Sequence, residues 1–318
     1  MFADNNVMME RHVISLMEFE PKEIESIVDL GIKMKKNPKN YENALHGKTL
    51  AMLFQKTSTR TRMSFEVGMQ QLGGHAVFLD WMKTQFQLAD LRDETRALCR
   101  YCDAIMARLL RHEDLRTMAS VATVPVINGC DEMHHPCQAL ADVMTIKEAL
   151  GRAKGVRVAY LGIANNVSNS LSLATTATGM EFTLCASERH PPSLDHALLK
   201  RVKATGLYSE TKEATGLKKA VAGADVLCTD SWVDMELFSN PAFAREKERR
   251  LKALMPFQIN ASLMKLNPRA KVMHGMPMHV GYEITRDAIE SRNALIFDQA
   301  ENRLHAQKAL LLKLLWKV

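Results

Sequence analysis

Residues 48–74, KTLAMLFQKTSTRTRMSFEVGMQQLGG, carry the pattern that decides the fold. The opening KTLAMLF is a short apolar run, which is typical of a buried strand. The segment from Thr61 is predicted to be a helix, and the glycine pair Gly73-Gly74 is predicted to end it. Polar residues fill the turn between the strand and the helix. A strand, a turn and a helix in this order make one β-α unit.

The same unit recurs along the chain. The strand-like runs HAVFLD, DAIMARLL and VPVIN alternate with segments of helical period, the last of which is a helix predicted at residues 136–150. Beyond the junction GRAKGVRV, a second series begins with VRVAYLGI and continues through EFTLCA, ADVLCTD and AKVMHGM. Repeated β-α units predict mostly parallel sheets with helices on both faces.

We therefore predict an α/β protein of two doubly wound parallel-sheet domains joined by interdomain helices. The first domain is assigned to residues 1–150 and the second to residues 151–298. Residues 299–318 belong to the amphipathic segment DQAENRLHAQKALLLKLLWKV, which is predicted to be a helix that packs back on the first domain.

Composition and charge exclude several classes of protein. The 318 residues carry a net charge of +6, which suits an anionic substrate but is too small and dispersed to indicate nucleic-acid binding. No apolar run approaches the ~18 residues that a membrane span needs, and the N-terminus has no signal-peptide pattern. The six cysteines are scattered, as expected for thiols in a reducing compartment. We expect a cytoplasmic protein without a metal site.

The turn of the first unit is the most informative part of the sequence. Ser58, Thr59, Arg60, Thr61 and Arg62 stand where the strand gives way to the helix. A helix start offers unpaired backbone N–H groups, hydroxyls add donors, and arginine adds bidentate bonds to phosphate oxygens. No glycine-rich loop is present, so the turn is not a P-loop. A capped helix start with surface arginines is the alternative, but five such residues are more than a cap requires.

Several segments resemble the transcarbamylase family, and most closely its ornithine carbamoyltransferases. STRTR at residues 58–62 and HHPCQALAD at residues 134–142 are similar to two specific motifs of that family. LGIANNVSNSL and TDSWVDM resemble its amino-acid-binding segments, and FDQAENRLHAQKALL resembles its closing helix. The resemblance covers nearly the whole chain. It implies that the first domain binds carbamoyl phosphate and that the second binds an acceptor amine.

The implied reaction is the attack of an amine on the carbonyl carbon of carbamoyl phosphate, from which phosphate leaves without help from a cofactor. By resemblance, Arg108 would span phosphate and carbonyl oxygen, His135 would donate to that oxygen, and Gln138 would bind the carbamoyl amino group. Arg60 and Thr61 complete the implied catalytic set, whereas Arg62 is expected to support the turn. The residues implied to hold carbamoyl phosphate are Ser58, Thr59, Arg60, Thr61, Gln85, Arg108, His135, Gln138, Met276 and Arg303.

The acceptor is implied to bind at Asn166, Asp230, Asp234, Met235 and Gly275. Asn166 and Asp230 would take the carboxylate and the α-amino group, although each could equally cap a helix. This half departs from the family pattern: a hydroxyl becomes the carboxylate of Asp234, the thiol of His-Cys-Leu-Pro becomes Gly275, and an acidic residue becomes Ile163. We interpret the carbamoyl phosphate half as intact and the acceptor half as altered. The acceptor is then ornithine or a related basic amine.

Two other interpretations stay open. A dinucleotide-dependent dehydrogenase is disfavoured, because LGIANNVSNS lacks the G-x-G-x-x-G that lets the backbone approach a pyrophosphate. A paralogue that binds a ligand without turnover is suggested by the changes at Gly275 and Asp234. The resemblance also implies a homotrimer with shared active sites, in which Gln85 would reach across to a neighbouring subunit.

Overall fold

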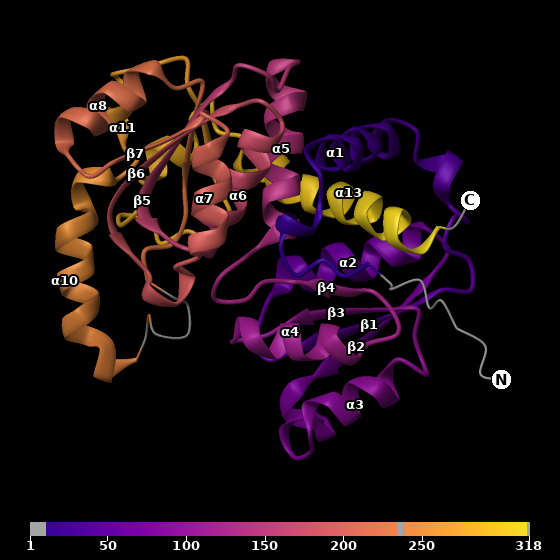
Figure 1. Cartoon of the computed structure of the whole chain (residues 1–318). Coiled ribbons are helices and arrows are strands. Elements are labelled where there is room, and N and C mark those ends of the chain that lie inside the picture. The colour runs from indigo at the N-terminus through magenta and orange to yellow at the C-terminus, as the bar shows by residue number, and fades with distance from the viewer. Residues whose placement is uncertain (1–10, 234–237, 239, 317–318) are drawn as a thin grey trace.

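Two parallel β-sheets form the frame of the protein (Figure 1). The computed structural model describes residues 11–233, 238 and 240–316. The first sheet has the order β2-β1-β3-β4 and consists of β1 (Thr49–Phe54), β2 (His75–Asp80), β3 (Ala104–Arg108) and β4 (Val126–Asn128). The second has the order β7-β6-β5-β8-β9 and consists of β5 (Arg157–Ala164), β6 (Glu181–Arg189), β7 (Tyr208–Thr211), β8 (Val226–Thr229) and β9 (Lys271–His274). The predicted fold class is confirmed.

Helices follow the strands in both units. The first unit holds α2 (Thr59–Gln71), α3 (Leu91–Leu98) and α4 (His112–Val121). The second holds α6 (Asn166–Ala177), α7 (His196–Ala204), α8 (Ala214–Gly223), α10 (Ala244–Leu254), α11 (Ala261–Met264) and α12 (Arg286–Ile289). The strand β7 and the helix α8 were not predicted, because YSET is short and polar and gives no strand signal.

Three helices join the two units: α1 (Pro21–Lys36), α5 (Pro136–Leu150) and α13 (Ile296–Leu315). Figure 1 shows α13 in yellow beside α1 and above α2, and it packs against α1, α2 and α5. The helices α1 and α5 in turn pack against α6 of the second unit. The predicted return of the C-terminal helix to the first unit is therefore confirmed.

The alternate side chains of β1 explain how the first sheet is held. Leu50 and Met52 belong to a core that includes residues of α1, α5 and α13, whereas Ala51 and Leu53 belong to a separate core on the other face. A parallel sheet covered on both faces reads as a continuous apolar run, which is why TLAMLF contains no polar position after Thr49.

The strand order of each sheet contains one topological switch point. In the first sheet, β1 lies between β2 and β3, and in the second, β5 lies between β6 and β8. Open α/β sheets bind ligands at the carboxyl ends of the strands where the winding direction reverses. The loops after β1, β3, β5 and β8 are therefore the expected binding loops.

Candidate active site

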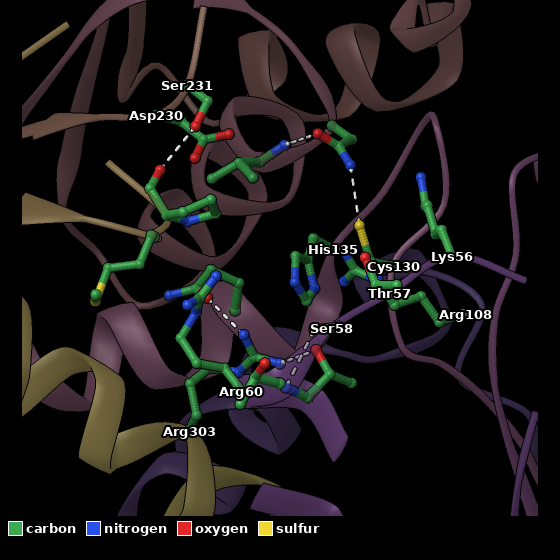
Figure 2. Close-up of a pocket in the computed structure, with 18 of the residues that line it drawn as sticks. Lys56, Thr57, Ser58, Arg60, Arg108, Cys130, His135, Asp230, Ser231 and Arg303 are labelled. Atoms are coloured by element: carbon green, nitrogen blue, oxygen red, sulfur yellow. Dashed lines mark hydrogen bonds between the residues drawn. The ribbon is translucent and has the colours of Figure 1, made fainter. Parts of the chain in front are cut away.

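One pocket of about 310 Å³ is lined by residues that follow β1, β4, β5, β8 and β9, together with Arg108 at the end of β3 and Arg303 of α13. Figure 2 shows Asp230 and Ser231 across the pocket from Arg60 and Arg303. The pocket brings together most of the residues predicted from sequence: Ser58, Thr59, Arg60, Thr61, Arg108, His135, Gln138, Asn166, Asp230, Gly275, Met276 and Arg303.

The start of α2 forms one wall. Ser58 is the N-cap, and its Oγ accepts a hydrogen bond of 3.3 Å from the backbone N–H of Thr61. The following N–H groups of the first turn and the positive end of the helix face the pocket region, a setting that attracts anions. Burial, together with the nearby Arg108 guanidinium, lowers the pKa of Arg60 below its ordinary value. Keeping Arg60 charged in this setting therefore costs free energy, and a bound anion would offset that cost.

His135 caps α5 on the same side of the pocket. Its backbone N–H donates to Ser170 Oγ of α6 at 2.8 Å, which fixes the position of the residue between the two units. Burial, and then the charges of Arg303 and Arg108, hold the pKa of His135 well below its ordinary value. The imidazole is therefore neutral at neutral pH and retains one N–H to donate.

Several buried side-chain nitrogens at the pocket have no partner within the part of the chain that the structure describes. They are Arg108 Nε, Arg303 Nε and one ring nitrogen of the neutral histidine, His135 Nδ1. Unpaired buried polar groups are costly and call for an explanation such as a ligand or water. Together with Lys56 and Arg60, they make this half of the pocket strongly suited to an anion.

Arg303 reaches the pocket from the C-terminal helix α13. Its two terminal nitrogens donate to Gln138 Oε1 at 2.7 Å and to Thr61 Oγ1 at 3.1 Å. Burial lowers the pKa of Arg303 to about 10. Because these contacts join α13 to α5 and α2, the returning helix is a structural part of the site.

The second-unit wall is built around Asp230, which follows β8. Asn165 Nδ2 donates to Asp230 Oδ2 at 2.9 Å, while Asn165 Oδ1 accepts from Tyr160 and from the Ser168 N–H at 3.0 Å each. Burial raises the pKa of Asp230, and the hydrogen bond from Asn165 partly opposes that rise. Asp230 is the only acidic side chain among the described residues that line the pocket.

Asn166, the first residue of α6, is held by the loop before α5. Its Nδ2 donates to the Asp131 carbonyl at 2.6 Å and to Cys130 Sγ at 3.3 Å, and its Oδ1 accepts from the Val167 N–H. The Asp131 carboxylate accepts from the N–H groups of Met133 and His134. The loop that carries His135 is thereby fastened to the second unit.

The segment after β9 closes the pocket. His274 Nδ1 accepts from the Met276 N–H at 2.8 Å, and His274 Nε2 donates to Glu283 at 3.1 Å. A Cβ on Gly275 would stand 3.5 Å from Asp230 Oδ1 and 3.6 Å from Gln138 Cδ, which are ordinary contact distances. Met276, not Gly275, has the left-handed backbone, with φ of 56°. Nothing in the backbone at position 275 therefore requires glycine.

Some predicted residues lie elsewhere. Gln85 is exposed on the segment after β2 and does not line this pocket of the single chain. Asp234 and Met235 lie outside the described residues. Ile163 is buried in the core of the second unit. Arg62 pairs with Glu66 at 3.1 Å on the exposed side of α2 and stays out of the pocket.

Sequence reasoning missed other lining residues, notably Lys56, Cys130, Asn165 and Ser231. Asn165 and Ser231 lie inside segments that were recognised, and Lys56 stands two residues before STRTR, so position in the sequence was an available signal. Ser231 Oγ donates to the Pro277 carbonyl at 2.8 Å, a link that no local pattern reveals. Within residues 11–233, 238 and 240–316 there is no group of three or more His, Cys, Asp or Glu side chains able to hold a metal ion. The helices in those ranges include none long and apolar enough to cross a membrane.

The two α/β units enclose a pocket whose first wall carries cations suited to a small anion and whose second wall carries one carboxylate, Asp230. The model of the aspartate/ornithine carbamoyltransferase carbamoyl-P binding domain matches residues 11–148, and that of the Asp/Orn binding domain matches residues 154–314. The chain belongs to the aspartate/ornithine carbamoyltransferase family, as the sequence motifs predicted.

Individual relatives resemble the chain over almost its full length. The ornithine carbamoyltransferase of Methanospirillum hungatei is 41% identical over 311 residues, which cover 96% of this chain and 100% of the relative. The anabolic ornithine carbamoyltransferase of Pyrococcus furiosus is 43% identical over 310 residues, or 95% of each chain. The solved structure of an ornithine carbamoyltransferase from Pyrococcus furiosus matches with a TM-score of 0.86 at 42% identity, covering 96% of each chain.

Proposed function

We propose that this protein transfers the carbamoyl group of carbamoyl phosphate to the side-chain amine of ornithine, or of a related basic amine, and releases phosphate. The observation that carries the proposal is the convergence of Lys56, Arg60, Arg108 and Arg303 with the start of α2, opposite Asp230. The family and the near relatives named ornithine carbamoyltransferase support the same reaction.

Carbamoyl phosphate binds with its phosphate against the start of α2. The hydroxyls of Ser58, Thr59 and Thr61 and the backbone N–H groups of the first helical turn donate to the phosphate oxygens. Arg60 adds a charge-assisted bond, and Arg108 extends from the phosphate to the carbonyl oxygen. The unpaired buried donors of Arg108 and Arg303 support this placement, because an anion would satisfy them.

The carbamoyl group then points toward His135 and Gln138. Neutral His135 donates its N–H to the carbonyl oxygen as negative charge develops there, and Arg108 and Thr61 stabilise the same charge. The Gln138 carbonyl oxygen accepts from the carbamoyl amino group. Because Arg303 and α5 fix these groups before substrate arrives, little reorganisation accompanies the reaction.

The acceptor amine approaches from the second unit in its neutral form. Its nitrogen attacks the carbonyl carbon, the bond from that carbon to the phosphate-bearing oxygen breaks, and the amine proton ends on the released phosphate. The products are a ureido compound, which is citrulline from ornithine, and hydrogen phosphate. Asp230 attracts the other amino group of the acceptor, which is cationic, and the Met276 carbonyl orients the attacking nitrogen. Asn166, Asp234, Met235 and Gly275 complete the proposed acceptor site.

The alternative candidate is a paralogue that binds carbamoyl phosphate without turnover. The specific observation behind it is Gly275, which leaves free space between Asp230 and Gln138 where the family pattern has a thiol. A thiol is not required for the attack of a neutral amine, so we favour turnover.

The test is product formation. The purified protein is mixed with carbamoyl phosphate and ornithine, then with putrescine or lysine, and ureido products are measured by mass spectrometry. Citrulline formation that depends on protein is expected. Tight carbamoyl phosphate binding without product from any amine would instead establish the silent paralogue.

We further propose a homotrimer in which Gln85 of one subunit completes the carbamoyl phosphate site of the next. Support comes from the exposed apolar side chains beside it, since Val77, Phe78, Met82 and Leu88 are 37–82% exposed along β2 and the segment that follows. Light scattering should give a mass three times the 35.8 kDa of the chain. A monomer with full activity would contradict the shared site.

The domain boundaries and the compartment are also proposals. Residues 1–150 would form the carbamoyl phosphate domain, residues 151–298 the acceptor domain, and residues 299–318 the returning end of the chain. Limited proteolysis should cut near residues 151–155 before either sheet. All six cysteines are free thiols, which supports a cytoplasmic location.

A further inference from the structure

A buried polar chain runs between α5, α13 and the end of β9, behind the carbamoyl site. At its centre stands Asp142 of α5, a side chain with 2% exposure. Asp142 Oδ1 accepts one hydrogen bond from Gln138 Nε2 and another from Gln299 Nε2, each at 2.7 Å. Neither Asp142 nor Gln299 lines the pocket.

The two amides that contact Asp142 use their oxygens on opposite sides of the site. Gln138 Oε1 accepts from Arg303 at 2.7 Å, and Gln299 Oε1 accepts from the backbone N–H of His274 at 2.9 Å. A side-chain amide can be turned so that its nitrogen and oxygen exchange places. An ionised carboxylate accepts hydrogen bonds and cannot donate them, so it admits only the orientation that presents nitrogen.

We propose that Asp142 is a positioning residue for carbamoyl transfer, acting through both amides at once. It fixes the oxygen of Gln138 beside Arg303 for the carbamoyl group, and through Gln299 it holds the end of β9 that leads into Gly275. One buried carboxylate thereby sets the relative position of the two halves of the site. This inference rests on the proposed function.

The ionisation of Asp142 gives the proposal a distinctive signature. The charged or titratable groups that face it are Arg303 of α13, Asp230 and Cys228 at β8, and Tyr160 of β5. Burial raises the pKa of Asp142 to about 6, against the opposing effect of its two hydrogen bonds. Protonation removes the negative charge that strengthens both hydrogen bonds, so each amide is then held less firmly. Turnover should therefore fall as pH drops through about 6.

The effect on stability has the opposite sign. Because the pKa of Asp142 is higher in the folded protein than in the unfolded chain, acidification from pH 7 to pH 5 favours the folded state at this group. If activity falls near pH 6 while the protein stays folded, the loss comes from the positioning role of Asp142 and not from acid unfolding.

The test compares Asp142→Asn with Thr145→Val in the full-length protein. The substituted asparagine keeps the size of the side chain but lacks the negative charge, so it accepts from Gln138 and Gln299 more weakly. Thr145 accepts from Asn302 at 3.0 Å and joins the same two helices further from the pocket, which makes it the matched control. We expect Asp142→Asn to lower kcat about 10- to 100-fold, with KM for carbamoyl phosphate changed only a few-fold. Its pH profile should lose the limb near pH 6, and Thr145→Val should keep both kcat and the limb.

A second variant tests the same chain of hydrogen bonds at another residue, in case Asp142→Asn fails to fold. Gln299→Leu removes the link to His274 without a new charge and should lower kcat and raise KM for the acceptor. Unchanged kcat in Asp142→Asn, or an equal loss in Thr145→Val, would overturn this inference and leave the proposed function standing. Absence of product from the wild-type protein would overturn the proposed function, and this inference with it.

Discussion

The two walls of the pocket are built on different principles. The first-unit wall gathers Arg60, Arg108 and Lys56, with Arg303 added by α13, and leaves donors of its arginines unpaired within the described chain. The second-unit wall presents amides that are already bonded inside the protein, Asn165 to Asp230 and Asn166 to the Asp131 carbonyl. The first wall is therefore prepared to bind an anion. The second wall is fixed by its internal hydrogen bonds, so few of its polar groups remain to contact an acceptor.

The difference has a physical cause. Burial, and then the charge of Arg108, lower the pKa of Arg60, so a bound dianion would stabilise its charged form. Across the pocket, Asp230 can attract a cation, but Gly275 adds no side chain beside it. Changes in the second wall should therefore alter which amine reacts, while changes in the first should abolish binding of the common donor.

The largest effect is expected from Arg60→Gln. Loss of the charge-assisted phosphate contact, worth about 1.5–3 kcal/mol, should weaken carbamoyl phosphate binding about 10- to 150-fold. Calorimetry measures the change. Arg62→Gln is the matched control, since Arg62 lies on the same helix but pairs with Glu66 and stacks over Phe78. Equal losses in the two variants would show that net charge, not the site, is responsible.

Asp230→Asn should have the next largest effect, confined to the other wall. The variant keeps an oxygen for the bond from Asn165 but loses the carboxylate charge, so KM for ornithine should rise about tenfold. Carbamoyl phosphate affinity should be unchanged or slightly higher, because a negative charge near the arginines has gone. Steady-state kinetics with each substrate varied separately distinguishes these results. A selective loss of carbamoyl phosphate affinity would reverse the assignment of the walls.

The sequence predicted the two walls to different extents. Ser58, Thr59, Arg60 and Thr61 of the first wall follow from a contiguous strand-turn-helix pattern, since local sequence dictates the start of α2. Arg108 and Arg303, which come from β3 and α13, were assigned only by resemblance to the family. The second wall depends on contacts between distant segments. Asn165 and Asn166 are neighbours with equal chemistry, and only the packing of β8 decides that Asn165 meets Asp230. Likewise, no local pattern could show that Ser231 bonds to the Pro277 carbonyl or that Cys130 reaches Asn166.

Gly275→Cys should give a moderate effect on the second wall. The added Cβ fits at contact distance, and a compatible replacement of glycine stabilises a protein by about 0.4–1 kcal/mol. Turnover with ornithine should rise while carbamoyl phosphate affinity stays the same. Gly275→Ala, which adds the Cβ without the thiol, separates filled space from sulfur chemistry. If neither variant changes acceptor preference, position 275 does not select the amine.

The smallest effect is expected from Asp195→Asn, away from both walls. His134 Nε2 lies 3.1 Å from Asp195 Oδ2 and joins the loop before α5 to α7, and this hydrogen bond is the main cause that lowers the pKa of Asp195 to about 2. A depressed carboxyl pKa stabilises the fold above pH 4, and this contribution disappears as pH falls from about 4 toward 2. Asparagine keeps the helix cap, so the free energy of unfolding in urea should drop by only about 1 kcal/mol. Altered substrate affinity would show that this contact also shapes the pocket.

The most direct test of the division between the walls is calorimetric titration of carbamoyl phosphate in the absence of any amine. We predict saturable binding to the wild-type protein, equal or tighter binding to Asp230→Asn, and strongly weakened binding to Arg60→Gln. Wild-type protein that binds carbamoyl phosphate only when ornithine is present, or Asp230→Asn as damaged as Arg60→Gln, would contradict the account.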